Sequence, residues 1–175
     1  MRKLHLGCGQ NYIENWINID SHSPYKIDLC YDLRNPLPYH EESVDFIFNE
    51  HFIEHLTLNE GLVFLKECYR VLKINGVLRI STPSLNWLVS MYVANKLDEW
   101  KDVGFMPTTK CNLMNEGMRS WEHIYIYDYE QLVSVLENAS FKQIYSVPWR
   151  KSIYEELNGL ECRPYHRELI IEAVK

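Results

Sequence analysis

The sequence lacks the features that mark membrane-spanning, secreted and disulfide-built proteins. Its 175 residues contain no apolar run near the roughly 18 residues that span a membrane. The N-terminal stretch lacks the long apolar segment of a secretory signal. The five cysteines are odd in number and scattered, and no C-x-x-C pair is present, so neither a disulfide scaffold nor a cysteine zinc site is indicated. We therefore expect a cytoplasmic protein that does not enter a membrane.

The sequence also has no excess of basic residues. It contains 18 Lys and Arg against 24 Asp and Glu, for a formal charge of −6. Because proteins that bind nucleic acid through its phosphates need a basic surface, this charge argues against a nucleic-acid partner. A small-molecule substrate is expected instead, while the oligomeric state stays open. With 46% apolar residues, the chain can build one folded domain.

The hydrophobic pattern alternates between strands and helices. Strands are expected at 3–6, 16–19, 26–30, 44–48, 76–81, 141–147 and 168–174. One helix is expected to begin at a capping box of Thr57 and Glu60 and to stop at Asn75-Gly76, and another at Asp128–Asn138 is capped by Asp128. This order predicts an α/β fold with a largely parallel sheet and helices on its faces.

Residues 83–127 interrupt this alternation. They hold an unusual number of aromatic side chains: Trp87, Tyr92, Trp100, Phe105, Trp121, Tyr125 and Tyr127. A helix is expected near Leu85–Tyr92. A long aromatic segment after a central strand is typical of a substrate lid, although such side chains also commonly cover a sheet. We expect a single domain over residues 1–175 with a lid or insert at 83–127.

The first expected strand runs into the turn Gly7-Cys8-Gly9, but no third glycine completes a dinucleotide motif, because Tyr12 occupies its place. That glycine allows close packing of the helix whose N-terminus holds a pyrophosphate, so NAD and FAD are disfavoured. Asp20 ends the second strand, where a carboxylate can accept hydrogen bonds from both ribose hydroxyls. A cofactor with adenosine but no phosphate, such as S-adenosylmethionine, suits this turn.

The sequence H-F-I-E-H at 51–55 matches the H-x-x-E-H pattern of inverted zinc peptidases. In that interpretation His51 and His55 share a zinc ion and Glu54 activates water. Those peptidases place both histidines inside a long helix, whereas here Thr57 begins a new helix two residues after His55. A zinc hydrolase built on these three residues is kept as an alternative, and the favoured interpretation predicts no metal.

Motifs across residues 3–82 resemble those of class I S-adenosylmethionine-dependent methyltransferases, and most closely the small type 11-like predicted methyltransferases. The motifs are L-H-L-G-C-G, W-I-N-I-D, D-L-R-N-P-L-P-Y, S-V-D-F-I-F-N-E-H-F-I-E-H-L and L-K-I-N-G-V-L-R-I. The resemblance implies a Rossmann-like, seven-stranded, mostly parallel sheet with helices on both faces and an antiparallel C-terminal hairpin. It also implies methyl transfer from S-adenosylmethionine.

The same resemblance implies a set of cofactor-binding residues. They are Gly7, Cys8 and Gly9 at the methionine moiety and ribose, Asp20 at the ribose, Asp32 and Leu33 at the adenine, and Asn49 and Glu50 at the methionine end. One departure from the family pattern is that only ten residues separate Gly9 from Asp20, where a longer helix is usual.

A hydroxyl acceptor would also require a base that takes its proton. We expect His51 or His123 in this role, because His51 follows the fourth strand and His123 adjoins the aromatic segment. The acceptor is expected to be a small molecule with a hydroxyl group, such as a sugar or another metabolite. A domain that binds the cofactor without catalysing transfer is the second alternative.

Overall fold

The computed structural model of the chain describes residues 1–21, 24–101, 104–163 and 168–175. In this part of the chain seven strands form one sheet, in the order β3-β2-β1-β4-β5-β7-β6. They are β1 (Lys3–Leu6), β2 (Ile17–Asp20), β3 (Leu29–Cys30), β4 (Val44–Glu50), β5 (Leu72–Pro83), β6 (Gln143–Ser146) and β7 (Glu168–Val174). β7 runs antiparallel to both of its neighbours, β5 and β6, and every other pair of neighbouring strands is parallel. The predicted seven-stranded, mostly parallel sheet with an antiparallel C-terminal strand pair is confirmed.

The helices of the described residues are α1 (Leu58–Val71), α2 (Leu85–Ala94), α3 (Lys110–Arg119) and α4 (Tyr129–Asn138), with 3-10 turns η1 (Ile53–His55), η3 (Ser120–Glu122) and η4 (Glu155–Leu157). The helices α1, α2 and α4 begin where the sequence predicts them, whereas α3 was not predicted. The capping box is present, since Thr57 and Glu60 each accept a hydrogen bond from the other's backbone amide. The end of α1 differs from the prediction: Leu72 is already extended and opens β5, so the left-handed Asn75 lies inside β5.

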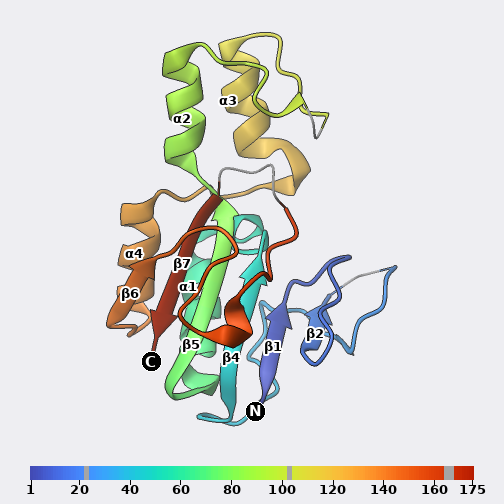
Figure 1. The fold of residues 1–175 in the computed structure, drawn as a ribbon, viewed down its shortest axis with the longest axis vertical. Coiled ribbons are helices and arrows are strands. Elements are labelled where there is room, and N and C mark those ends of the chain that lie inside the picture. Colours follow the sequence, from blue (N-terminus) through green and yellow to red (C-terminus); the bar gives the residue numbers. More distant parts are fainter. Residues whose placement is uncertain (22–23, 102–103, 164–167) are drawn as a thin grey trace.

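Helices cover only one face of the sheet in the described residues, which corrects the expectation of helices on both faces. In Figure 1, α1 and α4 lie behind the sheet, and their apolar side chains belong to the larger core cluster. The other face is covered by residues 147–163, here called the strap. Its side chains Tyr154, Leu157 and Leu160 pack with Phe48 of β4. Between Gly9 and Asp20 the chain forms only turns before β2, so no helix covers this face there.

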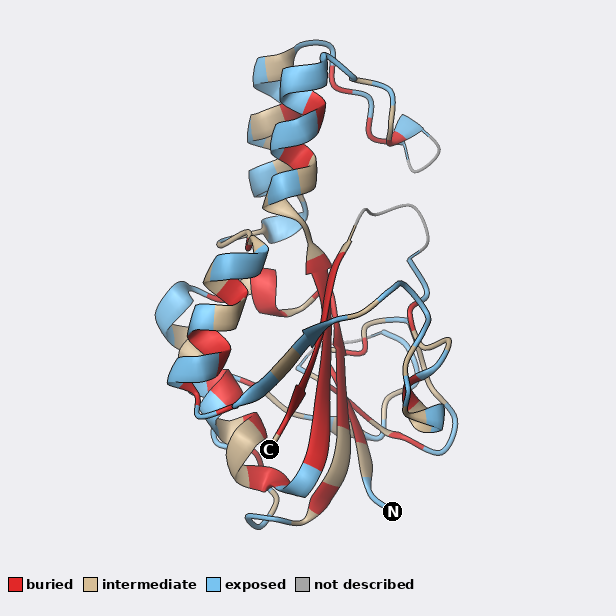
Figure 2. Cartoon of the chain, turned by 60° about the vertical axis from the view of Figure 1, so that its left-hand side comes forward, coloured by how far each residue is buried: buried red, intermediate tan, exposed pale blue. Residues whose placement is uncertain are grey.

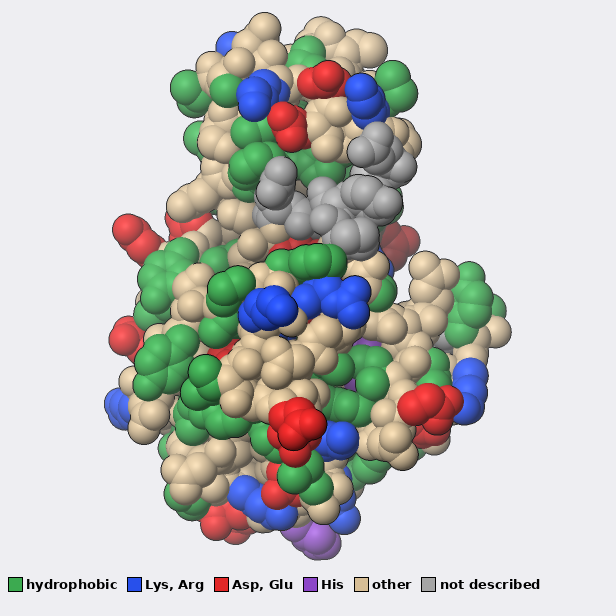
Figure 3. Space-filling model, viewed as in Figure 1, with side chains coloured by type: hydrophobic (Ala, Val, Ile, Leu, Met, Phe, Trp, Pro, Cys, Tyr) green, Lys and Arg blue, Asp and Glu red, His purple; other side chains and the backbone are tan. Residues whose placement is uncertain are grey.

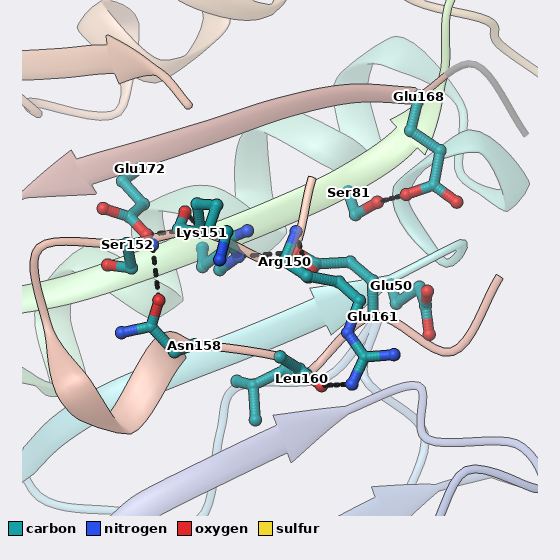
Figure 4. A network of polar contacts seen from close by, with 12 residues as sticks. Glu50, Ser81, Arg150, Lys151, Ser152, Asn158, Leu160, Glu161, Glu168 and Glu172 are labelled. Carbon is teal, nitrogen blue, oxygen red and sulfur yellow. Dashed lines mark hydrogen bonds and ion pairs between the residues drawn. The ribbon is translucent and has the colours of Figure 1, made fainter. Parts of the chain in front are cut away.

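A buried ionic network fixes the strap to the sheet. Arg79 of β5 donates from Nε to Glu161 of the strap at 2.6 Å and from Nη1 to Glu172 of β7 at 2.5 Å. The same Nη1 donates to the carbonyl of Lys151 at 3.0 Å. All three charged side chains are buried, and Figure 4 shows Glu161 and Glu172 reaching this network from different segments. The strap is therefore held by charge as well as by apolar contact.

His5 of β1 is buried without a counter-charge in contact. Burial lowers its pKa to about 4, although a bond between its Nδ1 and Asn18, 3.1 Å apart, opposes the shift. A folded-state pKa below the unfolded one means that the unfolded chain binds the proton more readily. The stability that His5 contributes is therefore complete above about pH 6.5 and is lost as the pH falls towards 4.

We expect protonation of His5 to lower the free energy of unfolding by about 2 kcal/mol between pH 7 and pH 5. Glu168 has the opposite effect on the pH dependence of stability. Burial raises the pKa of its carboxyl to about 7, so the folded chain binds this proton more readily than the unfolded chain. The measurement is therefore a comparison of urea unfolding between the wild type and His5→Gln at both pH values. An identical pH dependence in the two proteins would contradict the assignment.

The insert at 83–127 leaves the sheet at the end of β5, and its two ends lie side by side there. Ser84 and Tyr127 form an isolated bridge, and the Leu85 amide donates to the Tyr127 carbonyl at 2.9 Å. Between these ends, α2 and α3 project beyond the carboxyl end of β5 (Figures 1 and 2). The two helices pack closely at Gly117, where an added Cβ would lie only 2.6 Å from Leu88 of α2. They share a small apolar cluster of their own.

The face of the molecule seen in Figure 3 carries charges of both signs, as the composition predicts. On the face seen in Figure 3, basic and acidic side chains are interspersed over the strap and the sheet edge. All five cysteines are free thiols. Among the described residues, no helix combines the length and the apolar character that crossing a membrane requires.

Candidate functional site

A cleft lies beyond the carboxyl ends of β1 and β2, beside the glycine turn. It is lined by Gly7, Asp20, Ser21, Asp32, Leu33, Arg34, Phe52, His55, Leu56 and Glu122. Four of the predicted cofactor residues, at positions 7, 20, 32 and 33, therefore share one hollow. We call it the glycine-turn cleft.

The glycine turn has the backbone that its sequence requires. Gly7 and Gly9 have φ of +70° and +50°, which side chains rarely tolerate. The Gly7 amide donates to the Ile19 carbonyl at 2.9 Å, and the Gly9 amide donates to Oδ2 of Asp20 at 2.9 Å. A Cβ at Gly7 would lie 2.7 Å from Phe52, whereas one at Gly9 would meet nothing within 4 Å. The turn is thus packed on one side and open on the other.

Cys8 lies between these glycines with its side chain buried. Burial raises the pKa of its thiol to about 11. The residue therefore has a neutral side chain directed into the protein, and its amide donates to the Ile19 carbonyl at 3.2 Å. Its contact with the cofactor stays a prediction.

Asp32 at the rim of the cleft is held by Arg34. The guanidinium donates to the carboxylate from Nε at 3.0 Å and from Nη2 at 2.7 Å, and the Arg34 amide adds a third bond at 3.0 Å. These hydrogen bonds lower the pKa of Asp32 to about 2. Asp32 is therefore a fixed carboxylate, next to the buried Leu33.

Asn49 and Glu50, predicted at the methionine end of the cofactor, are not among the residues that line the cleft. Asn49 donates from Nδ2 to the Leu6 carbonyl at 2.8 Å. Glu50 is buried and accepts hydrogen bonds from the amides of Cys162 and Arg163 at 3.0 and 3.2 Å. Both residues join the end of β4 to other segments, and their direct contact with a cofactor stays a prediction.

The stretch H-F-I-E-H does not lie on one helix. His51 follows β4 with a left-handed φ of +51°, and η1 contains only three residues. The two ring nitrogens of His51 lie 3.2 Å from Oε1 of Glu54 and 3.1 Å from Oε1 of Glu168. With both nitrogens facing carboxylates, His51 cannot share a zinc ion with His55 as the inverted zinc peptidases require. This corrects the zinc hydrolase alternative built on His51, Glu54 and His55.

The surroundings of His51 also argue against its predicted role as a base. Burial opposes its charged form, but Glu168 and Glu54 outweigh this effect and raise the pKa of His51 to about 9. Near neutral pH the ring already carries its proton and has no free lone pair. Ser81 also donates to the Glu168 carboxylate (Figure 4). His51 therefore acts as a buried cation that positions Glu54 and Glu168.

His123, the other predicted base, belongs to the insert and lies near Glu54. The amides of Ile124 and Tyr125 donate to the Glu54 carbonyl at 2.7 and 3.1 Å, which clamps this segment to η1. The rings of His123 and His55 lie 5.3 Å apart, centre to centre. Burial lowers the pKa of His123, so the ring is mainly neutral near pH 7. Of the two predicted bases, His123 has the protonation state that the role requires.

A second hollow, the aromatic pocket, begins at His123. It is lined by Pro83, Ser84, Trp87, Leu88, Trp100, Phe105, Gly117, Trp121, His123 and Ile126. Trp121 and Glu122 both have left-handed backbones, with φ of +57° and +67°. Such conformations are uncommon for large side chains and concentrate at functional sites. Because His123 lines this pocket while His55 and Glu122 line the glycine-turn cleft, the two hollows meet at the His55–His123 pair.

Sequence patterns missed several members of this region. Phe52 and Glu122 gave no signal, because neither belongs to a recognisable motif. Glu168 was missed as well, since it lies 117 residues from its partner His51. Glu54 and His55 were considered as zinc-site partners of His51, as ligands of a metal with Glu50, and as residues that only satisfy neighbouring groups. The structure adds His123 as a neighbour of both.

Comparison with known proteins finds a family match over part of the chain. Residues 14–80 match the family model described as a methyltransferase domain. No curated protein sequence matches the chain.

Solved structures share the fold over almost the whole chain. A SAM-dependent methyltransferase from Archaeoglobus fulgidus aligns with a TM-score of 0.63 at 19% identity, covering 99% of this chain and 86% of that one. One from Thermotoga maritima, described as a possible histamine N-methyltransferase, gives 0.56 at 17%, with coverage of 99% and 82%. One from Mesorhizobium loti gives 0.58 at 12%, with coverage of 99% and 90%. At these identities the likeness concerns the fold.

Proposed function

We propose that the protein is a class I S-adenosylmethionine-dependent methyltransferase that transfers a methyl group to a hydroxyl of a small molecule held in the aromatic pocket. The matched methyltransferase domain and the shared fold support the class and imply S-adenosylmethionine as the cofactor. The hydroxyl acceptor is the more specific part of this proposal. The observation that carries it is the meeting of the glycine-turn cleft and the aromatic pocket at His55 and His123.

The glycine-turn cleft fits the cofactor. The open side of Gly9 lets a ligand approach the backbone, and Asp20 lines the cleft where a carboxylate can accept hydrogen bonds from ribose hydroxyls. The missing third glycine does not matter for a ligand without a pyrophosphate. When bound, S-adenosylmethionine supplies a methyl group on a positively charged sulfur. The chain's own residues have to align the acceptor with that methyl group and exclude water.

The lining of the aromatic pocket suits a small acceptor with an apolar face and a hydroxyl, and its cavity of about 40 Å³ has to widen to admit one. Trp121 packs edge-on against Phe105, with ring centres 5.5 Å apart, and lies 5.7 Å from His123. Aromatic rings of this kind bind flat ligand surfaces, including the apolar faces of sugars. A hydroxyl nucleophile must lose its proton during transfer. The polar end of the pocket, at His123 and the neighbouring Glu54 and His55, is where the proton would be removed.

The direct test measures cofactor binding and transfer separately. Calorimetry with S-adenosylhomocysteine tests the cleft, and methyl transfer from S-adenosylmethionine to matched hydroxyl and amine compounds tests the acceptor. We expect cofactor binding and transfer to hydroxyl compounds. An absence of binding at millimolar ligand would overturn the cofactor assignment. Binding with transfer only to amines would overturn the hydroxyl, and binding with no transfer would favour the non-catalytic alternative.

Replacing Trp121 with alanine is expected to raise KM for the acceptor about 10- to 100-fold, because one large face of the pocket is lost. The dissociation constant of S-adenosylhomocysteine should stay within twofold, since Trp121 does not line the glycine-turn cleft. Trp149→Ala is the matched control, because this exposed tryptophan lies on the strap and does not line the aromatic pocket. Equal KM changes in the two variants would contradict the acceptor site.

A further inference from the structure

We infer that Glu54, His55 and His123 form a site for a transition-metal dication at the junction of the glycine-turn cleft and the aromatic pocket. One ligand atom from each of the three side chains lies within 4.8 Å of the other two. Ligand atoms that share a zinc-type ion at about 2.1 Å lie roughly 3–4 Å apart, so small side-chain adjustments close the site. The inference departs from the expectation that the protein binds no metal, and it rests on the proposed function for its catalytic role.

Glu54 provides the second observation, a buried carboxylate oxygen without a hydrogen-bond donor among the described residues. Its side chain is completely buried, and Thr82 donates to Oε2 at 2.9 Å. The other oxygen, Oε1, accepts no hydrogen bond from the described residues. His51 Nδ1 lies 3.2 Å from this oxygen, where charge attraction acts but the hydrogen-bond geometry is not met. Oε1 therefore has one charged neighbour and no hydrogen bond, so its lone pairs remain available to a metal ion.

The two histidines are oriented as metal ligands usually are. Nδ1 of His55 lies 3.2 Å from the Glu122 carbonyl, and Nδ1 of His123 lies 3.4 Å from the Gly117 carbonyl. Because a carbonyl only accepts, each Nδ1 must carry the hydrogen, which leaves the lone pair on Nε2. Ligating histidines typically donate their other nitrogen to a carbonyl or carboxylate in this way.

The lone pair of His123 lies near the Glu54 carboxylate. Nε2 of His123 lies 4.0 Å from Oε1 of Glu54. A neutral imidazole that presents its lone pair to a carboxylate oxygen is unfavourable unless a cation lies between them. Backbone clamps preserve the arrangement, since Ile124 and Tyr125, next to His123, donate to the Glu54 carbonyl.

The ligand types select the ion. Two imidazoles and one carboxylate suit Zn²⁺, Mn²⁺, Fe²⁺ or Co²⁺, whereas Ca²⁺ and Mg²⁺ prefer all-oxygen ligands. Three protein ligands leave coordination positions open, as catalytic metal sites require. His51 is not a ligand in this arrangement, because its nitrogens face Glu54 and Glu168.

The location of the site gives it a role in the proposed transfer. His55 lines the cleft, and His123 lines the pocket, so an acceptor hydroxyl in the pocket could occupy an open position. A coordinated hydroxyl loses its proton more readily, and here that proton passes to solvent. The oxygen then forms the O–CH₃ bond while the C–S bond breaks and its electron pair stays on sulfur. The products are the methyl ether, S-adenosylhomocysteine and one proton.

Metal binding is tested on the full chain after treatment with a chelator and desalting. Titration with Co²⁺ is followed by visible absorption, and Zn²⁺ is then added as a competitor. We expect one Co²⁺ per chain, displaced by Zn²⁺, and at least 10- to 100-fold weaker binding in Glu54→Gln, His55→Ala and His123→Ala. His40→Ala is the matched control, because this exposed histidine is distant in the sequence from all three ligands. Undiminished binding in the three variants, or no Co²⁺ binding by the wild type, would overturn the site.

Two further measurements separate this inference from the proposed function. S-adenosylhomocysteine binding is measured by calorimetry before and after chelation, and we expect it to be unchanged. Transfer to the hydroxyl panel should fall at least tenfold on chelation and return with Zn²⁺ or Mn²⁺. Equal transfer with and without chelator would overturn the catalytic role of the metal while leaving the proposed methyl transfer intact. Failure to bind S-adenosylhomocysteine, with Co²⁺ still bound, would instead overturn the proposed function alone.

Discussion

Replacing Arg79 with alanine is expected to lower the free energy of unfolding by about 3–5 kcal/mol, as is typical when one partner of a buried ion pair is removed. Arg79 is fully buried and contacts Glu161 and Glu172 at 2.6 and 2.5 Å. Without it, two buried carboxylates lose their counter-charge, and the Lys151 carbonyl loses a donor. Because the whole fold is stabilised by only about 5–15 kcal/mol, the variant should be partly unfolded at physiological temperature.

Chemical unfolding followed by circular dichroism measures this effect. Arg119→Ala, on the exposed end of α3, is the matched control and should change stability by less than about 0.5 kcal/mol. Combining Arg79→Ala with Glu161→Gln and Glu172→Gln should recover part of the loss, since no uncompensated charge then remains. If the triple variant is no more stable than Arg79→Ala, the charge argument is wrong and packing alone accounts for the loss.

Replacing Asp20 with alanine is expected to weaken S-adenosylhomocysteine binding about 10²- to 10³-fold. Hydrogen bonds to a charged acceptor are worth about 1.5–3 kcal/mol each, and the carboxylate is placed to accept from two ribose hydroxyls. The same carboxylate accepts the Gly9 amide at 2.9 Å, so the glycine turn loses an anchor as well. The lost ribose hydrogen bonds and the lost Gly9 anchor both weaken the cofactor cleft, and neither removes a contact of the hydrophobic core.

Calorimetry with S-adenosylhomocysteine measures the loss, and two variants control it. Asp20→Asn keeps an oxygen that can accept the Gly9 amide, so it should bind more tightly than Asp20→Ala but more weakly than the wild type. Asp98→Ala removes an exposed carboxylate within the insert and should leave affinity unchanged. A change below threefold in Asp20→Ala would remove Asp20 from the cofactor site.

The strap explains how this fold manages without helices on its second face. It covers β4 with Tyr154, Leu157 and Leu160, and its later residues Cys162 and Arg163 donate to Glu50 at the end of β4. The resemblance to methyltransferases implied that Glu50, at the end of β4, contacts the methionine end of the cofactor. In the structure its carboxylate is used to hold the strap, so a residue at the expected edge of the sheet has a structural partner that lies 112 residues away.

The sequence by itself determined the parts of this protein that depend on neighbours along the chain. The alternation of short apolar runs predicted the seven strands, and Thr57 with Glu60 predicted the start of α1, because capping acts across three residues. Gly7 and Gly9 predicted the turn, because only glycine adopts its left-handed backbone easily. The cofactor class followed from that turn together with the strand-end Asp20.

Only the tertiary structure decided what the ionisable side chains do. His51 fits a zinc motif in sequence, but Glu168, 117 residues away, turns it into a buried cation. His123 has no motif, yet the backbone bonds of its neighbours to Glu54 bring it beside His55. Burial and charge depend on every group that surrounds a side chain, and folding gathers these groups from distant segments. For this reason the fold and the cofactor class could be predicted from local patterns, whereas the candidate metal site could not.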